Sequence, residues 1–233
     1  MSSHAIRDYR RLVRRKLKQW PGDRRLAVAQ AIGAPTLEDF EDWGDRQVAV
    51  LRHHGLANGM AIYDFGCGCG RTAQALVRAG WVGTYKGADI IPELVAEIGR
   101  TCPGYEAIVH CELNLAALTQ SQDFVFHWSV FTHLYPEECY ILLMDIFRVL
   151  KPGGKLVFSF LEFGPPKHDA IFERNVAIIR GGRRPPHLDQ FLHRDWIRHF
   201  AEKIGFEQIE FTDGTDRRNH PPLGQSIASM VKP

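Results

Sequence analysis

Asp64 and the glycines that follow it form the segment whose residue types most clearly suit ligand binding. The run Asp64-Phe-Gly-Cys-Gly-Cys-Gly70 places glycine at every second position, after an apolar strand pattern and before a helical one. Glycine tolerates positive φ angles and lets a ligand approach the backbone closely. The following helix would offer unpaired N–H groups, so we expect a ligand at this turn.

The spacing of the glycines narrows the choice of ligand. Dinucleotide-binding turns carry G-x-G-x-x-G, whereas Arg71 stands at the third glycine position counted from Gly66. The triphosphate-binding sequence G-x-x-x-x-G-K-[ST] does not occur in the chain. The carboxylate of Asp64 would repel a pyrophosphate, so it suits a ligand with a cationic end.

Five motifs together resemble one family. The run from Asp64 to Gly70 matches E/D-x-G-x-G-x-G, the first motif of the class I, Rossmann-like methyltransferases that use S-adenosylmethionine (SAM). Further matches follow in the right order at Ala88-Asp89-Ile90, Glu112, 123–134 and 147–157. The chain resembles the small-molecule branch of this family, closely over 44–161 and by strand order alone over 192–233.

The resemblance implies a SAM site on the matching residues. Asp64 would hold the methionine ammonium, and Asp89 would accept hydrogen bonds from the ribose hydroxyls, with a simple helix N-cap as its alternative role. Glu112 would lie near the adenine amino group or be a solvated loop acid. The implied cofactor residues are Asp64, Gly66, Cys67, Gly68, Asp89, Ile90, Glu112, Leu113 and His127, with Trp43 and Arg46 closing over the cofactor carboxylate.

Histidines supply the candidate general bases. A sulfonium methyl group is already activated for in-line displacement, so the protein mainly aligns the reacting atoms, and a base helps a hydroxyl acceptor. His127, at the end of the predicted fourth strand, is the first candidate, with a polar wall of the pocket as its alternative role. His133 is the second candidate, although we expect it to be mainly structural. His168, His187 and His193 lie in or beside a predicted insertion and could face the substrate.

We therefore expect an enzyme that moves a methyl group from SAM to a small-molecule or glycan acceptor, at oxygen, without a metal, leaving S-adenosylhomocysteine. Methyltransferases that act on the amino groups of nucleic acid bases often carry Asn/Asp-Pro-Pro-aromatic after the fourth strand, where this chain has His127-Trp-Ser-Val130. One alternative is an RNA- or DNA-associated methyltransferase with a basic arm. Another is a non-methylating protein that binds SAM or NAD.

From residue 60 onward, alternating strand and helix patterns predict the scaffold. Strands are expected at 60–64, 84–89, 105–111, 123–128, 155–161, 206–211 and 225–231, with helices between most of them and a turn at 151–154. The strand at 155–161 is almost continuously apolar, as strands buried on both faces are. We predict an α/β fold with a doubly wound, mostly parallel seven-stranded sheet and helices on both faces.

The remaining segments predict the domain organisation. Helical patterns at 5–20, 23–32 and 44–55 precede the first strand. We assign residues 1–43 to an N-terminal helical extension and 44–233 to the SAM-binding domain. Residues 162–191 interrupt the alternation after the fifth strand, with a short helix at 169–179. This insertion is expected to be a lid or substrate loop.

The first predicted helix is strongly basic. Residues 7–25 hold nine Arg or Lys and two Asp. Such a helix could contact an anionic membrane surface, nucleic acid phosphates or an anionic substrate, or be a solvated face beside the cofactor site. Arg183, Arg184, Arg217 and Arg218 add positive charge to predicted loops, so we favour an acidic or phosphate-bearing acceptor over nucleic acid.

Composition sets the remaining limits. The 233 residues suit one sizeable α/β domain, and the formal net charge is only +2. Five cysteines without a C-x-x-C pair indicate neither a disulfide framework nor a zinc site. With no apolar stretch of membrane-spanning length and no signal-like N-terminus, the expected location is cytoplasmic.

Overall fold

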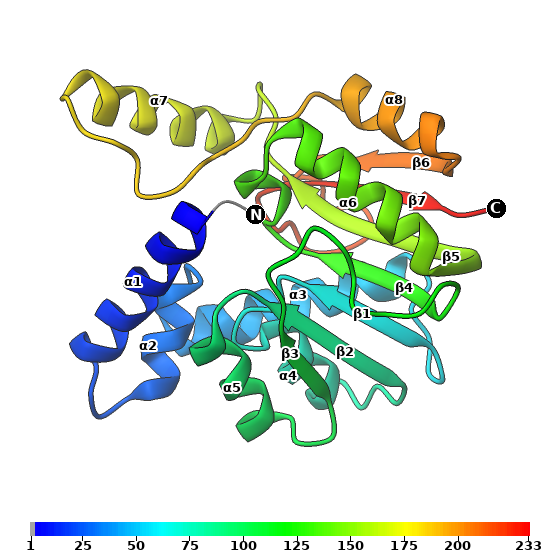
Figure 1. Cartoon of the computed structure of the whole chain (residues 1–233), viewed down its shortest axis with the longest axis horizontal. Coiled ribbons are helices and arrows are strands. Elements are labelled where there is room, and N and C mark those ends of the chain that lie inside the picture. The colour runs from blue at the N-terminus through cyan, green and yellow to red at the C-terminus, as the bar shows by residue number, and fades with distance from the viewer. Residues whose placement is uncertain (1–2) are drawn as a thin grey trace.

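The strands of the computed structural model, which describes residues 3–233, join into one sheet in the order β3-β2-β1-β4-β5-β7-β6. Only β7 runs antiparallel to its neighbours, β5 and β6. This confirms the predicted seven-stranded, mostly parallel fold (Figure 1). The strands are β1 Ala61–Phe65, β2 Thr84–Asp89, β3 Glu106–Val109, β4 Gln122–His127, β5 Leu150–Phe160, β6 Glu207–Thr212 and β7 Ser226–Val231.

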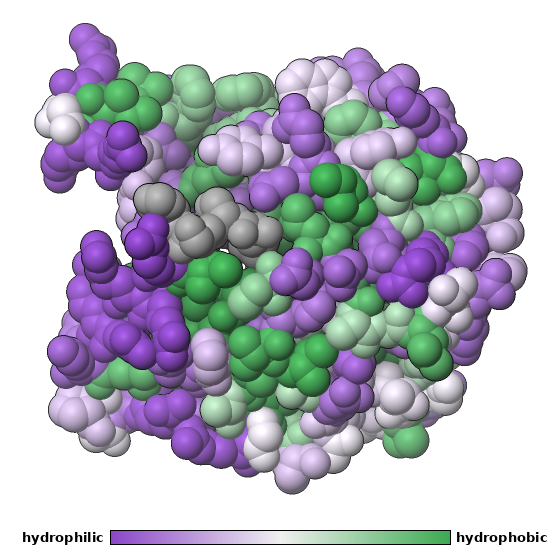
Figure 2. Space-filling model, in the orientation of Figure 1, coloured by the Kyte–Doolittle hydropathy of each residue, from purple (hydrophilic) through white to green (hydrophobic). Residues whose placement is uncertain are grey.

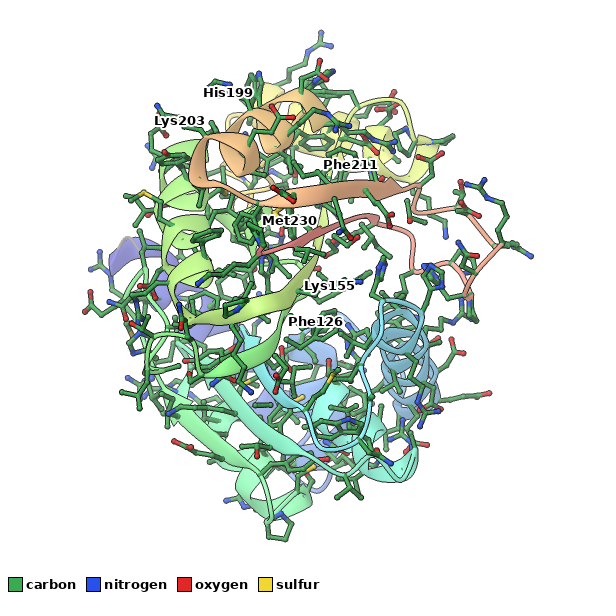
Figure 3. The ribbon with its side chains drawn as sticks, turned by 90° about the vertical axis from the view of Figure 1, so that its right-hand side faces the viewer. Phe126, Lys155, His199, Lys203, Phe211 and Met230 are labelled. Atoms are coloured by element: carbon green, nitrogen blue, oxygen red, sulfur yellow. The ribbon has the colours of Figure 1, made fainter. Side chains whose placement is uncertain are left out.

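Helices cover both faces of this sheet because its central strands are apolar on both sides. One core cluster packs α3 (Leu37–His53), α4 (Arg71–Arg78) and α5 (Pro92–Thr101) against residues such as Phe126. A second packs α6 (Pro136–Val149) and α8 (Arg194–Ile204) against residues such as Met230. Figure 3 shows Phe126 and Met230 on their strands, viewed from one side of the sheet.

Two local predictions are wrong. The third helix begins at Leu37 rather than at residue 44, because the Thr36 side chain accepts a hydrogen bond from the Asp39 N–H and caps it. The segment predicted as a turn at 151–154 instead forms an irregular start of β5. There the Gly153 N–H donates to the Lys232 carbonyl at 2.8 Å, and the register shifts beside it. The domain division after residue 43 stays a prediction, and α3 runs across that point.

The N-terminal helices α1 (Ser3–Gln19) and α2 (Arg24–Ala31) lie over the end of the sheet that carries the glycine turn. Val13 is fully buried in a small core that also contains Cys69 of that turn. Arg10 and Arg14 both form ion pairs with Glu93 of α5, at 3.2 and 3.1 Å. These contacts attach α1 firmly beside the turn.

The segment after β5 departs from the packed layers. Its helix α7 (Pro166–Arg180) begins three residues earlier than predicted and extends away from the sheet (Figure 1). His168 is the only buried residue among the fifteen of this helix. The chain returns through 181–193, where Leu161 and Phe191 form an isolated parallel bridge.

The close crossing of α3 and α4 generates a stability prediction. A Cβ atom added at Gly44 would lie 2.9 Å from the Arg71 carbonyl oxygen and 3.1 Å from Ala75 Cβ. Gly44→Ala should therefore destabilise the protein by about 1 to 3 kcal/mol through overpacking. Denaturant unfolding measures this difference.

Gly99→Ala is the matched control, because a Cβ atom on this residue of α5 would meet nothing within 4 Å. Removing a glycine from an open helical position should stabilise the protein by about 0.5 to 1 kcal/mol. Equal effects of the two substitutions would show that the α3–α4 crossing tolerates the extra atom.

Candidate cofactor and acceptor site

A cavity of about 540 Å³ opens at the carboxyl ends of β1, β2 and β4. Strand order reverses at this point, since β2 and β4 flank β1 on opposite sides. Open α/β sheets bind ligands in the crevice at such a switch point. The wall comes from the sheet ends, α1, η1 (the 3-10 turn Phe131–His133), α7 and the segment after it.

The glycine turn forms one wall of the cavity. Gly66 has φ +76°, and a Cβ atom there would lie 2.4 Å from Val130 Cγ2. Gly68 has φ +56° and lies close to Ile32 of the N-terminal extension. Cys67, between them, is buried and also lines the cavity. The glycines are thus required both by backbone conformation and by space.

Asp89 stands at the end of β2, beside the turn. One carboxylate oxygen accepts a hydrogen bond from the Gly68 N–H and the other from the Ile91 N–H, both at 2.9 Å. Burial nevertheless raises the pKa of Asp89 to about 6, against these hydrogen bonds. The carboxylate is therefore held in one orientation, and Asp89 and Ile90 both line the cavity.

Asp64 lies deeper in the same wall. It is 2% exposed and accepts a hydrogen bond of 2.7 Å from the Tyr85 hydroxyl. Burial raises the pKa of Asp64 to about 7, and the nearby Asp89 charge adds to the shift. A carboxyl group so far from its ordinary pKa would gain from a cationic ligand group.

Arg71 was not predicted as a site residue, yet it lines the cavity. Its guanidinium lies 5.5 Å from the Trp43 ring centroid, and its buried Nε has no hydrogen-bond partner within the described residues. Arg46, which was predicted, does not line the cavity: it bonds to Asp42 and to the Pro222 carbonyl. Arg71 lies at the start of α4, and helix starts are where anions bind.

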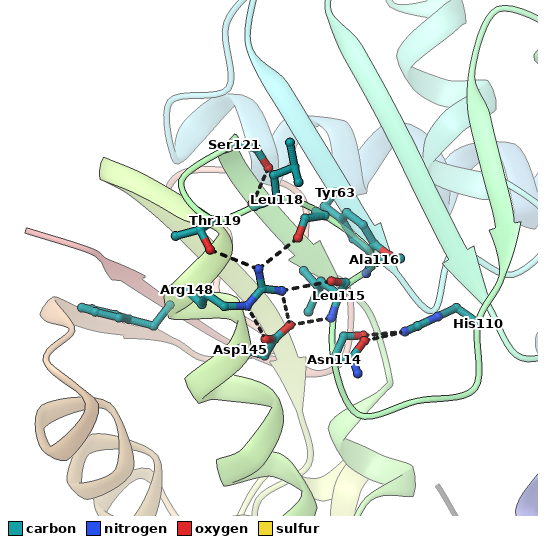
Figure 4. A network of polar contacts seen from close by, with 12 residues as sticks. Tyr63, His110, Asn114, Leu115, Ala116, Leu118, Thr119, Ser121, Asp145 and Arg148 are labelled. Atoms are coloured by element: carbon teal, nitrogen blue, oxygen red, sulfur yellow. Dashed lines mark hydrogen bonds and ion pairs between the residues drawn. The ribbon is translucent and has the colours of Figure 1, made fainter.

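The predicted adenine residues, Glu112 and Leu113, do not line the cavity. Because β3 ends at Val109 rather than at residue 111, the first residue beyond the strand is His110, and His110 does line it. The following loop is tied down by a polar network (Figure 4). His110 Nε2 lies 2.9 Å from Asn114, and Asp145 and Arg148 of α6 bond to the loop backbone.

His127, the first candidate base, is not brought to the cavity. It is fully buried, with ring centroids 4.3 Å from Phe131 and 4.9 Å from Phe158. Neither ring nitrogen has a hydrogen-bond partner among the described residues. Burial lowers the pKa of His127 to about 3. A histidine in this environment is an apolar-packed core residue that cannot reach a substrate.

The loop after β4, and not His127, lines the cavity. Ser129 adopts φ +58°, and its N–H donates to the Ser159 hydroxyl at 2.8 Å. The side chain of Gln225, just before β7, bonds to both serines, at 2.6 and 2.8 Å. Trp128, Ser129 and Gln225 line the cavity. Gln225 is 96 residues from Ser129 in the sequence, so only the tertiary structure brings the two side chains together.

His133 does line the cavity, paired with Tyr9 of α1. The Tyr9 hydroxyl donates to His133 Nε2 at 2.6 Å, and His133 Nδ1–H donates to the Leu188 carbonyl at 2.7 Å. Burial lowers the pKa of His133 to about 4 and raises that of Tyr9. His187 and Asp189 lie beside this pair, 3.3 Å apart.

The other histidines of the insertion hold structure. His168 bonds to the Glu162 and Gly224 carbonyls and is 1% exposed. The ring of His193 caps α8 by accepting from the Asp195 N–H. Of these histidines, His187 alone lines the cavity. Across residues 3–233, no three His, Cys, Asp or Glu side chains are placed to hold a metal ion.

A family profile described as a methyltransferase domain matches residues 63–158, which span β1 to β5 and the glycine turn. Residues 63–158 are therefore a methyltransferase domain, and the fold is shared with SAM-dependent methyltransferases of known structure. The matched part of the chain contains Asp64, Asp89 and the loop after β4.

Curated relatives of this chain differ in the activities that their names give. It is 28% identical to the SAM-dependent Diels-Alderase iccD of Talaromyces variabilis over 173 residues, 69% of this chain and 58% of that protein. It is 34% identical to the ubiquinone/menaquinone biosynthesis C-methyltransferase UbiE of Shewanella woodyi over 92 residues, 32% of this chain and 35% of that protein.

Solved structures share the fold. Magnesium protoporphyrin IX methyltransferase (ChlM) from Synechocystis, with bound S-adenosylhomocysteine, superposes with a TM-score of 0.65 at 18% identity, over 100% of both chains. A Haemonchus contortus phosphoethanolamine N-methyltransferase, in complex with phosphomonomethylethanolamine and S-adenosylhomocysteine, also gives 0.65 at 18% identity. It is matched over 95% of this chain and 60% of that one.

The bonds of His133 generate a spectroscopic prediction. Because the Leu188 carbonyl can only accept, His133 should be the neutral Nδ1–H tautomer, with a lone pair on Nε2. Its titration should have a midpoint near pH 4, since burial disfavours the charged form. Long-range ¹H–¹⁵N NMR reports both properties. A midpoint above pH 6, or a proton on Nε2, would contradict this geometry.

Proposed function

We propose that this protein methylates an oxygen atom of a small-molecule acceptor with SAM as the methyl donor. The observation that carries the proposal is that two kinds of residue line the same cavity. The glycine turn, Asp64 and Asp89 line one part, and Tyr9 and His133 line another. The first part suits the cofactor and the second part suits the acceptor.

The first part fits SAM group by group. The Asp89 carboxylate keeps lone pairs free for the ribose hydroxyls, and Gly66 and Gly68 admit the ribose and methionine chain. The Asp64 carboxyl would face the ammonium group. The buried, unpartnered Arg71 Nε suits the carboxylate, with Trp43 fixing the guanidinium plane. His110 replaces Glu112 and Leu113 as the proposed neighbour of the adenine.

Tyr9 and His133 suit an acceptor hydroxyl. When bound, SAM supplies an electrophilic methyl group to the acceptor oxygen. As that oxygen–carbon bond forms, the carbon–sulfur bond of the sulfonium would break to leave S-adenosylhomocysteine. The acceptor proton would pass to the Tyr9 oxygen, and the Tyr9 proton would pass to His133 Nε2. The resulting imidazolium keeps its Nδ1–H bond to Leu188, and the charge of Asp189 favours it. The low pKa of His133 means that this proton must then leave quickly.

A non-methylating use of SAM is the second candidate, because one relative is named a SAM-dependent Diels-Alderase. Incubation with methyl-labelled SAM and a panel of hydroxylated small molecules, read by mass spectrometry and NMR, separates the two. We expect a labelled O-methyl product and S-adenosylhomocysteine. A rearranged, unlabelled product would reject the methylation proposal, and a new carbon–methyl bond would reject the choice of oxygen.

Asp89→Ala tests the cofactor assignment. Loss of two charge-assisted hydrogen bonds to the ribose should weaken S-adenosylhomocysteine binding by about 3 kcal/mol, roughly a hundredfold. Isothermal titration calorimetry measures the change. Glu112→Ala is the control, because Glu112 is exposed and outside the cavity, and it should leave the affinity unchanged.

Cofactor affinity should also depend on pH. The pKa of Asp64 is raised to about 7 and that of Asp89 to about 6, so both are substantially protonated at pH 5.5 and ionised at pH 8. Since the ligand prefers the carboxylates, affinity should rise with pH through this window, by up to about tenfold per pH unit for each group. In Asp64→Asn the part centred near pH 7 should disappear. A flat wild-type profile would contradict this assignment.

Tyr9→Phe tests the acceptor half. Removing the hydroxyl interrupts the proton path, so kcat with the acceptor found in the screen should fall by about a hundredfold or more. Affinity for S-adenosylhomocysteine should stay unchanged. Tyr140→Phe is the matched control, because Tyr140 packs against Phe200 on the far side of α6 and does not line the cavity. Equal kcat values for the two variants would remove Tyr9 from the mechanism.

A further inference from the structure

Exposed apolar side chains gather on α7 and its flanks. Phe163 and Ile179 are 61% and 60% exposed, and Phe172 and Val176 are also exposed. Phe172, Val176 and Ile179 follow the i, i+4, i+7 spacing of one helix face. Phe163 continues this stripe, with its ring centroid 5.1 Å from that of Phe172. Phe191 packs against the rings of Phe163 and Phe172, yet all four side chains of the stripe stay exposed.

Unpaired cations flank this apolar stripe. The side chains of Arg180, Arg183 and Arg184 at the end of α7, and of Arg11 and Arg15 on α1, are exposed. None of these five side chains has an ion-pair or hydrogen-bond partner within residues 3–233. We call these arginines, together with Phe163, Phe172, Val176 and Ile179, the α1–α7 face. In Figure 2 both segments lie on one side of the molecule, apolar along α7 and hydrophilic over α1.

Charge is concentrated on the two segments that form this face. Residues 3–19 carry a formal net charge of +6 and residues 163–188 carry +3, whereas the whole chain carries +2. The rest of the chain is therefore net −7. Such an asymmetry orients the molecule toward an anionic partner.

The apolar stripe together with the exposed arginines fits one class of partner. A second copy of the chain, related by a two-fold axis, would bring two strongly positive faces together. A nucleic acid backbone would use the arginines but would leave the aliphatic Val176 and Ile179 exposed. An anionic bilayer surface takes both kinds of side chain, with apolar groups in the interface and cations at the phosphates.

We propose that the α1–α7 face docks this protein on an anionic lipid bilayer. The cavity is lined by Tyr9 and Leu12 of α1 and by Ile171 and Arg174 of α7, so the two docking segments form part of its wall. Docking would bring this part of the cavity wall close to the lipid. No helix within residues 3–233 is long and apolar enough to cross a membrane, so the contact is peripheral.

Co-sedimentation of the full chain with vesicles tests the proposal. We expect binding to vesicles of phosphatidylcholine with phosphatidylglycerol, weakening with salt, and much weaker binding to phosphatidylcholine alone. The triple variant R180Q/R183Q/R184Q should bind roughly a hundredfold more weakly, at about fivefold per arginine. Ile179→Asp should weaken binding by about tenfold or more, because it places a charge in the apolar stripe.

Val82→Asp is the matched control, since Val82 is 69% exposed and precedes β2 at the opposite end of the sheet. It should bind vesicles as the wild type does. Equal binding to the two kinds of vesicle, or equal losses in Ile179→Asp and Val82→Asp, would overturn the proposal. So would a dimer, seen by ultracentrifugation, that Ile179→Asp abolishes without changing vesicle binding. Affinity for S-adenosylhomocysteine, measured on each variant, separates failure of docking from failure of the cofactor site.

Discussion

The hydrogen bond from the Gly68 N–H to the Asp89 carboxylate connects the ends of β1 and β2, and a local bond from the Ile91 N–H fixes the same carboxylate. They hold the glycine turn at a fixed height above the sheet and orient the carboxylate into the cavity. The turn can close this tightly only because Gly66 has no Cβ atom to meet Val130. The other walls of the cavity lie around the glycine turn and Asp89.

Three charged side chains beside this turn lack a full set of ion-pair or hydrogen-bond partners. Asp64 and Asp89 have raised pKa values because burial penalises their ionised forms, and Arg71 has a buried, unpartnered Nε. Buried charges without partners destabilise a fold. A ligand with an ammonium group, a carboxylate and vicinal hydroxyls would satisfy all three side chains at once, which is the chemical reason for assigning SAM to this end.

The end of the cavity that we propose for the acceptor is built differently. Tyr9 comes from α1, His133 from η1, and the Leu188 carbonyl from the segment after α7. Two of these three parts, α1 and the segment after α7, lie outside the matched residues 63–158, and all three meet at two hydrogen bonds. The α1–α7 face is made of two of these parts, so the proposed chemistry and the proposed docking depend on the same additions to the common fold.

Predictions from the sequence were accurate for features that a short run of residues determines physically. Short apolar segments between helical patterns predicted the seven strands, and the Asp64–Gly70 run marked the turn, because backbone sterics and burial act locally. An error of two residues in a strand end changes which residue reaches the cavity: β3 ends at Val109 and not at residue 111, so His110 lines the cavity and Glu112 does not. The position of His127 at a strand end did not reveal that its ring points into the phenylalanine core, because strand residues alternate between faces and loops re-aim the backbone.

By itself, then, the sequence determined the fold class, the glycine turn and the acidic residues at the ends of β1 and β2, since each follows from residue types within a few positions of one another. Only the tertiary structure decided which histidine reaches the cavity, that Arg71 rather than Arg46 lines it, and that Tyr9 faces His133 across 124 residues. The physical reason is that burial and hydrogen-bond partners are properties of packed neighbours, and those neighbours are distant in the chain.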